Sequence, residues 1–321
     1  MKKILIPVIA AAFAAGIFGM SACAGEDDSI SIATTIFPEY DWVINILGDN
    51  PAGAEVTLLL DNGVDLHSYQ PTADDILKIS TCDLFVYVGG ESDRWVEDAL
   101  AEAVNEDMKV IRLLDVLSGS VKEEEIVEGM EAEEEEESEE DEPEYDEHVW
   151  LSLRNASVLT KAICETLQEI DPGNAEQYGS NEADYTARID ELDKEYQAAV
   201  DAAPVKTLLF GDRFPFRYLT DDYGIEYYAA FAGCSAETEA SFETIIFLSQ
   251  KMDELSLHSI MAIEGSDCRL AETIASNAKA DGLQILTLDS MQGTTSKDIA
   301  DGADYLSIMT KNLDVLKEAL K

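Results

Sequence analysis

The chain has 321 residues, of which 67 are Asp or Glu and 21 are Lys or Arg, so its formal net charge is −46 at pH 7. This charge excludes binding to nucleic acid, because proteins that bind it neutralise phosphates with Lys and Arg, and it leaves no basic patch for anionic lipid. The apolar fraction of 46% excludes a wholly disordered polymer. The length predicts about two domains. Cations are the natural ligands of such a chain.

The first residues have the features of an export signal. Lys2 and Lys3 precede an apolar run over 4–20, and small residues stand directly before Cys23. This arrangement resembles the signal of bacterial lipoproteins, which implies that residues 1–22 are removed and that Cys23 carries a lipid. The alternative is a single uncleaved membrane anchor. Both interpretations place the domain outside the cytoplasm, at the cell membrane.

An acidic segment interrupts the chain at 123–147, where 17 residues are acidic and none is basic. Such a segment cannot bury enough apolar surface to order itself, so we expect a solvated, disordered loop over 122–147. It is either a solubilising insertion or a weak collector of divalent cations, because many carboxylates concentrate cations without chelating any one tightly.

Four cysteines remain after Cys23, and an exported protein can pair them in three ways. Cys234 and Cys268 stand beside predicted loops in the C-terminal half, so we favour a disulfide between them and a second one between Cys82 and Cys164. The alternative is that some remain free as small buried apolar side chains. None has CxxC spacing, which argues against a thiolate metal site.

Short β-rich runs alternate with helical periodicity on both sides of the acidic segment. In the first half the runs predict strands at 31–36, 55–60, 84–88 and 109–113, and helices at 39–47, 73–79 and 92–104. After the acidic segment we expect a short strand at 148–151. A helix capped by Asn155 should follow it and end at Asp171-Pro172-Gly173.

The second half repeats the alternation after one long helix. Apolar residues at spacings of three and four within 181–203 predict a helix of about 28 residues if it begins near Asn174, or roughly 42 Å. Further strands are expected at 206–210, 225–229, 259–264 and 284–288, and further helices at 216–223, 238–255, 269–280 and 299–320.

This alternation predicts an α/β fold of two lobes, each with a parallel sheet flanked by helices and joined by the long central helix. The predicted limits are 23–173 for the N-terminal lobe, 174–203 for the linking helix and 204–321 for the C-terminal lobe. Ligands of open α/β sheets bind at the carboxyl ends of the strands, so the predicted site is the cleft between the lobes.

Two of the three histidines lie in segments that could contribute ligands to a metal site. His67 lies in the loop 63–72, and His148 follows the acidic segment in Asp146-Glu147-His148-Val149-Trp150-Leu151. Neutral imidazole binds first-row divalent metals, and carboxylate oxygens complete such sites. The third histidine, His258, stands between a predicted helix and a strand and is expected on the surface.

The loop 63–72, the run from His148 to Leu151 and the region 213–225 resemble the zinc- and manganese-type solute-binding lipoproteins of bacterial metal ABC importers. The similarity covers nearly the whole chain after the export signal, including the acidic loop before the second histidine and the long helix. It implies two α/β lobes joined by a rigid helix, with the metal between the lobes. By motif, His67 is the first ligand and His148 the second.

The resemblance implies a third ligand after the first strand of the second lobe, but an ungapped match places Arg213 there. The match rests on Phe216, Tyr218, Leu219, Tyr223 and Gly224. Arginine has no lone pair to offer a metal, whereas a two-residue bulge would bring Asp212 into the position, so we expect Asp212 as the ligand. The alternative is that Arg213 pairs with a carboxylate of the site and that fewer groups hold the metal.

The fourth implied ligand is Asp289, after the last strand, with Glu264 as a reserve. For either carboxylate the alternative is a helix N-cap or a solvated loop position. Two imidazoles and two carboxylates suit Zn²⁺ at about 2.0–2.2 Å. Replacing a histidine by Asp moves a site toward Mn²⁺, although the affinity order still favours zinc.

The resemblance therefore implies a non-catalytic carrier that binds Zn²⁺, or alternatively Mn²⁺, and delivers it to an ABC permease in the membrane. A rival interpretation is an exported metal hydrolase with Glu264 as general base, but the sequence contains no HExxH motif and no nucleophile elbow. A third is a surface adhesin in which the fold displays the acidic loop.

Overall fold

The computed structural model describes residues 29–131, 144–235, 239–280 and 282–321. The predicted export signal, the lipidation site at Cys23 and the middle of the acidic segment lie outside these residues. None of the described helices combines the length and the apolar character that crossing a bilayer requires.

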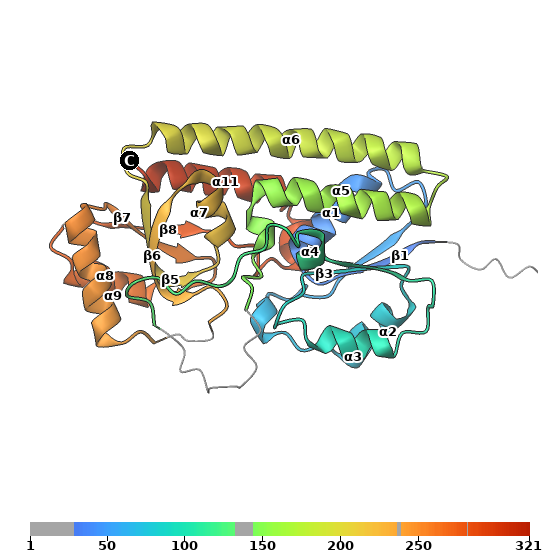
Figure 1. Ribbon diagram of the computed structural model, residues 1–321, viewed down its shortest axis with the longest axis horizontal. Helices are drawn as coiled ribbons and strands as arrows, with labels where there is room; N and C mark the ends of the chain where they lie inside the picture. The colour runs from blue at the N-terminus through green and yellow to red at the C-terminus, as the bar shows by residue number, and fades with distance from the viewer. Residues whose placement is uncertain (1–28, 132–143, 236–238, 281) are drawn as a thin grey trace, which may run out of the picture.

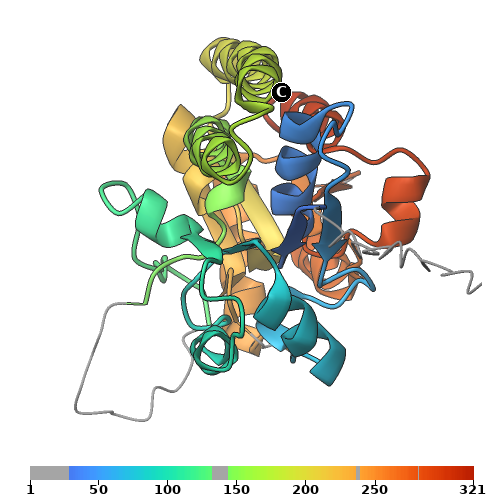
Figure 2. The ribbon, with the colours of Figure 1, turned by 90° about the vertical axis from the view of Figure 1, so that its right-hand side faces the viewer.

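The N-terminal lobe contains a four-stranded parallel sheet in the order β2-β1-β3-β4. Its strands are β1 (Ser31–Thr34), β2 (Glu55–Leu58), β3 (Leu84–Tyr87) and β4 (Lys109–Arg112), and its helices are α1 (Phe37–Leu47), α2 (Ala73–Thr81), α3 (Trp95–Ala101) and α4 (Leu113–Val116). The central strand β3 is an uninterrupted apolar run because helices cover both faces of the sheet. Figure 2 shows α1 on one side of this sheet and α2 with α3 on the other.

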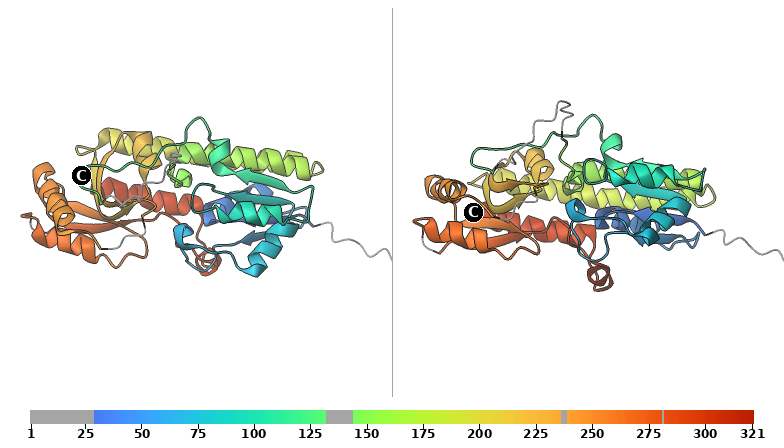
Figure 3. Two further views of the ribbon diagram at one scale, coloured as in Figure 1. Left: turned by 60° about the horizontal axis from the view of Figure 1, so that its bottom comes forward. Right: turned by 90° about the horizontal axis from the view of Figure 1, so that it is seen from below.

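The C-terminal lobe repeats this arrangement in the order β6-β5-β7-β8, again with parallel strands. Its strands are β5 (Thr207–Phe214), β6 (Glu226–Ala232), β7 (Ser259–Ile263) and β8 (Gln284–Leu288), and its helices are α7 (Arg217–Tyr223), α8 (Phe242–Leu255), α9 (Arg269–Asn277), α10 (Ser296–Ala300) and α11 (Tyr305–Ala319). Helices α8 and α9 pack on one face and α11 packs against β8. Figure 3 shows the two lobes side by side from two directions. The predicted fold class is confirmed.

Two long helices lie between the lobes in sequence and run beside each other in space. They are α5 (Leu153–Ile170) and α6 (Ala175–Ala202), which pack against one another. Figure 1 shows α6 extending along one side of the molecule above both sheets. Its 28 residues correspond to about 42 Å of helix, as the apolar spacing predicted.

Helix α6 is fastened to both lobes by hydrogen bonds of its tyrosines. In the N-terminal lobe the Tyr185 hydroxyl donates to Asp41 Oδ2 of α1 at 2.8 Å. In the C-terminal lobe the Tyr196 hydroxyl donates to the Met309 carbonyl of α11 at 2.6 Å. Because buried hydroxyls of this kind are costly to leave unpaired, these bonds oppose separation of α6 from either lobe.

One large apolar cluster runs through both lobes and links them beside the predicted site. Trp150 is fully buried, and its indole N–H donates to the Ser290 carbonyl at 2.8 Å. The Tyr305 hydroxyl donates to the Trp150 carbonyl at 2.7 Å. The backbone next to His148 is therefore anchored to the loop after β8 and to the first residue of α11.

The prediction of a strand at 148–151 is wrong, because Val149–Leu151 forms a short 3₁₀ helix, η2. Helix α5 begins at Leu153 with Ser152 as its N-cap instead of Asn155: the Ser152 hydroxyl accepts from the Asn155 N–H, and Asn155 Nδ2 donates back to the Val149 carbonyl. These local bonds compete with strand pairing.

The single helix predicted for 299–320 is two helices, α10 and α11. Gly302 between them has a φ of +98°, which ends a right-handed helix. The Asp304 carboxylate then accepts from the Ser307 N–H and starts α11 as its N-cap. The chain thus turns at 301–304 before the C-terminal helix.

The four described cysteines are free thiols, so both predicted disulfides are wrong. Cys82 and Cys164 are buried in the first lobe as small apolar side chains. The flanks of the acidic segment are also more ordered than predicted. Glu123 forms an antiparallel bridge with Tyr145, and the Glu131 N–H donates to the Ala230 carbonyl of β6 at 2.9 Å. The prediction for 132–143 lies outside the described residues.

The Asp41 contact generates a prediction for stability. Burial raises the pKa of Asp41 from 3.8 to about 6, the charge of Asp304 adds to the rise, and the Tyr185 hydrogen bond opposes it. The folded state therefore favours the protonated acid. This contribution to stability is complete below the pKa of Asp41 in the unfolded chain and is lost as the pH rises through about 6. The side chain of Asp41→Asn stays neutral at every pH. The free energy of unfolding of the variant, relative to that of wild type, should therefore increase by up to about 3 kcal/mol between about pH 4 and pH 8.

Urea denaturation at a series of pH values measures this difference. Asp49→Asn, at an exposed residue of the turn after α1, supplies the control for the change of carboxyl to amide, since surface substitutions alter the free energy of unfolding by less than about 0.5 kcal/mol. Parallel pH profiles of Asp41→Asn and wild type would contradict the prediction.

Candidate functional site

The candidate site lies where loops from the carboxyl ends of strands of both sheets converge. His67 follows β2, Ser92 follows β3, Arg213 is near the end of β5 and Cys234 follows β6. Carboxyl ends of parallel strands share one edge of a sheet, which places loops distant in sequence next to one another. His148 reaches the same place from the segment before η2.

His67 is held by a short 3₁₀ helix, η1 (Leu66–Ser68), whose N-cap is Asp65. The Asp65 carboxylate accepts from the His67 N–H at 3.0 Å. On the ring, Nδ1 lies 2.8 Å from Ser92 Oγ and 3.5 Å from Glu147 Oε2. These oxygens accept the Nδ1 proton, so the other ring nitrogen, Nε2, faces away from them.

His148 is fully buried and is oriented by the residue two positions before it. Asp146 Oδ1 accepts from the His148 N–H at 2.8 Å and lies 3.0 Å from the ring Nδ1. Glu147, between them, points to the His67 side, where its Oε1 accepts from the Ser92 N–H at 2.9 Å. Gly90 permits this approach, because a Cβ there would lie 2.3 Å from Glu147 Oε1.

The two imidazoles meet through their Nε2 atoms, which are 3.2 Å apart. With the proton of each neutral ring on Nδ1, both Nε2 atoms carry lone pairs aimed at one another. Two facing lone pairs repel unless a proton or a cation lies between them. Carboxylates behind metal-binding histidines fix ring orientation in this way and make the rings better ligands.

The electrostatics of the two rings differ. Burial, reinforced by the neighbouring His148, lowers the pKa of His67 to about 3. Burial also opposes a charge on His148, but Asp146 beside its Nδ1 outweighs burial and raises the pKa of His148 above its usual value. The pair therefore accepts one positive charge readily and a second one only with difficulty.

Cys234 completes a group of three, which the sequence prediction missed. One ligand atom from each of His67, His148 and Cys234 lies within 4.8 Å of the other two, the one such group of His, Cys or acidic side chains found among the described residues. Burial, reinforced by Glu124, raises the pKa of the Cys234 thiol well above its usual value. No spacing in the sequence connects this cysteine with the histidines, whereas Asp146 and Glu147 could have been found as neighbours of His148.

Arg213 forms an ion pair across the two lobes. Its Nη2 lies 2.6 Å from Asp65 Oδ2, on the same carboxylate that caps the His67 turn. Both side chains are about three-quarters buried, and Arg213 holds the pKa of Asp65 below its usual value despite burial. This pairing is the alternative arrangement that the sequence left open for Arg213.

The carboxylates expected as further ligands make other bonds. A bulge in β5 does separate Phe210 from Arg213, but Asp212 Oδ1 accepts from the Arg213 N–H and Oδ2 from the Ile263 N–H. Asp289 Oδ1 accepts from the Met291 N–H. Neither belongs to the group around the histidines.

The reserve ligand, Glu264, is also bound within its own lobe. Its Oε1 accepts from the Ser290 hydroxyl at 2.6 Å and its Oε2 from the Ser290 N–H at 2.7 Å. Burial, with the Asp289 charge adding, raises the pKa of Glu264 to about 7. These bonds tie the loop after β7 to the loop after β8.

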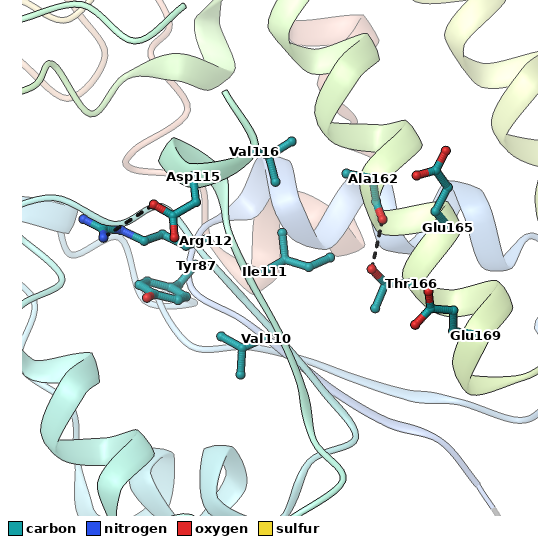
Figure 4. A pocket seen from close by; sticks show the side chains of 10 residues that line it. All are labelled: Tyr87, Val110, Ile111, Arg112, Asp115, Val116, Ala162, Glu165, Thr166 and Glu169. Carbon is teal, nitrogen blue, oxygen red and sulfur yellow. Dashed lines mark hydrogen bonds and ion pairs between the residues drawn. The ribbon is translucent and has the colours of Figure 1, made fainter. Parts of the chain in front are cut away.

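Two surface cavities formed by the described residues lie apart from the histidines. One lies over β4 and α5, and Figure 4 shows the polar side chains of Tyr87, Arg112 and Glu165 among those that line it. A second is lined by the loop after β2 and includes Asn62, Ser68 and Tyr69. Neither has His67 or His148 in its lining. Both imidazoles are buried, since 8% of the His67 side chain and none of the His148 side chain is exposed.

Asp146 provides a direct check of this geometry. In Asp146→Asn the amide oxygen can still accept from His148, but the charge that raises the pKa of His148 is gone, so that pKa should fall by about 1–3 pH units. NMR titration of the imidazole resonances, with chelator present, measures it. His258, exposed and remote, serves as the reference in the same spectra, and an unchanged His148 curve would contradict the assigned contact.

Comparison with known proteins finds relatives whose names describe them as zinc-binding or zinc-uptake proteins. The zinc-binding protein AdcA of Streptococcus pyogenes is 27% identical over 296 residues, covering 91% of this chain and 56% of that protein. The chain thus spans little more than half the length of this relative. The high-affinity zinc uptake system protein ZnuA of Bacillus subtilis is 30% identical over 298 residues, covering 92% of this chain and 89% of that one.

Solved structures show the same fold. The Zn(II)-bound ZnuA-like domain of Streptococcus pneumoniae AdcA matches 91% of this chain and 99% of its own, with a TM-score of 0.71 and 28% identity. The laminin-binding adhesin Lmb of Streptococcus agalactiae, 22% identical with a TM-score of 0.75, shares the fold. A family model described as zinc-uptake complex component A, periplasmic, matches residues 32–319. The chain belongs to this family, ZnuA.

Proposed function

We propose that the protein binds one Zn²⁺ ion between its lobes and delivers it to the permease of an ABC importer. The observation that carries the proposal is the convergence of two Nε2 lone pairs, each ring held from behind by an oxygen acceptor. Such an arrangement is unfavourable for neutral rings alone and favourable around a cation.

The distance between the rings supports zinc. Two nitrogens bound at about 2.0–2.1 Å to a tetrahedral ion lie about 3.3–3.4 Å apart, and the two Nε2 atoms are 3.2 Å apart. Nitrogen ligands also favour Zn²⁺ over Mn²⁺ in the affinity order of divalent metals. A manganese carrier of the same type remains the alternative that parallel titration tests.

A carrier fits the site better than an enzyme or an adhesin. Family membership supports a solute-binding role. The Glu264 carboxylate, which a hydrolase would need as a base, is engaged by Ser290 instead of facing the histidines. The likeness to laminin-binding proteins is one of fold alone, so adhesion is not part of the proposal.

The predicted ligands Asp212 and Asp289 stay predictions, since both carboxylates accept main-chain hydrogen bonds and neither belongs to the group around the histidines. We also keep the proposals of a lipid anchor at Cys23 after removal of 1–22 and of a position outside the cytoplasm. The relative named zinc-binding lipoprotein AdcA in Streptococcus pneumoniae, 30% identical over 324 residues, supports them.

Zinc titration of His67→Ala tests the proposal. Wild type should bind about one equivalent, and the variant should bind at least about 100-fold more weakly, because a direct ligand contributes more than an outer partner, which is worth about 10–100-fold. Competition with a chromophoric chelator measures the affinities, and a parallel Mn²⁺ titration measures selectivity.

His258→Ala is the matched control, since His258 is exposed and should leave zinc affinity unchanged. Zinc should also raise the thermal midpoint of wild type, because a ligand that binds only the folded state stabilises it. If zinc leaves that midpoint unchanged, or if both variants bind like wild type, the proposed function is wrong.

A further inference from the structure

Among the cysteines that the structure describes, Cys234 lies next to the two histidines. Its ligand atom and those of His67 and His148 lie within 4.8 Å of one another. Its thiol is free, and it is only partly buried, in contrast to Cys82 and Cys164. Sequence spacing argued against any thiolate metal site, so this position needs a structural explanation.

The backbone holds Cys234 at this place from both sides. The Cys234 N–H donates to Glu124 Oε1, from the flank of the acidic segment, at 3.1 Å. The preceding residue is Gly233, where a Cβ would lie 2.9 Å from both His148 Cε1 and the Phe214 carbonyl. Only glycine lets the chain pass this close to the imidazole, and it brings the next side chain to the histidine pair.

We propose that Cys234 is the third protein ligand of the metal site, so that the ion is bound by two imidazole nitrogens and one thiolate. This inference rests on the proposed function, and it identifies the group that acts where Arg213 occupies the expected ligand position. Binding breaks the S–H bond, forms a metal–sulfur bond and releases the proton to solvent. A fourth position of a tetrahedral ion remains for water or another ligand.

The sulfur ligand has a consequence for selectivity. Thiolate is a soft ligand that suits zinc, whereas manganese prefers carboxylate, carbonyl and water oxygens. The neighbouring carboxylates of Asp212 and Asp289 accept main-chain hydrogen bonds within their own lobe. The site therefore discriminates against manganese through sulfur and does not depend on a third imidazole.

Cobalt substitution of the full chain tests the proposal, because Co²⁺ occupies zinc sites and its thiolate bond gives an intense near-ultraviolet charge-transfer absorption that nitrogen and oxygen ligands lack. Wild type loaded with one equivalent of Co²⁺ should show this absorption. Cys234→Ser should lose it and should bind zinc at least about tenfold more weakly, while Cys268→Ser, at the other partly buried thiol, should match wild type.

A second measurement needs no variant. One equivalent of zinc should protect Cys234, but not Cys268, from alkylation by iodoacetamide, as mapped by mass spectrometry. Stoichiometric zinc binding by wild type without the cobalt absorption and without protection of Cys234 overturns this inference and leaves the proposed function standing. Absence of zinc binding to wild type overturns both.

Discussion

Repulsion between two lone pairs is the constraint on which the site depends. His67 and His148 come from separate segments, and each is turned so that its proton points back to an oxygen acceptor and its Nε2 points to the other ring. Buried carboxylates, including those of Asp146 and Glu147, maintain this alignment. Buried acids are unfavourable without partners. Their position directly behind the rings therefore indicates that the alignment of the two Nε2 atoms serves a function.

The rest of the architecture keeps this alignment intact across two lobes. Helix α6 is hydrogen-bonded to α1 on one side and to α11 on the other, and Trp150 joins the His148 segment to the loop after β8. Because a continuous helix resists bending, the lobes cannot separate by a wide hinge motion without breaking these bonds. Local movement of the turns that carry the histidines requires fewer contacts to be lost.

Sequence patterns could predict the two sheets and the histidine pair, because hydrophobic periodicity is local and each histidine sits in its own short motif. They could not predict Cys234, whose proximity arises from the folding of β6 against a loop of the other lobe. The 3₁₀ helix at 149–151 also escaped prediction, because its apolar residues are equally compatible with a strand. Side-chain hydrogen bonds of Asp146 and Asn155 decide the outcome. Disulfides were expected from the export signal and from the loops predicted beside Cys234 and Cys268, but neither feature determines the distance between two cysteines.

The ion pair of Arg213 with Asp65 has a consequence for the residence time of the cargo. The guanidinium charge lies close enough to disfavour a proton on His67, and the same field acts on any cation seated between the rings. Arg213 occupies the position at which the resemblance implies a third ligand, and a permanent positive charge there opposes very tight retention. We therefore expect the dissociation rate to be set in part by this arginine, so that the ion pair between the lobes also limits how long the metal ion stays between the rings.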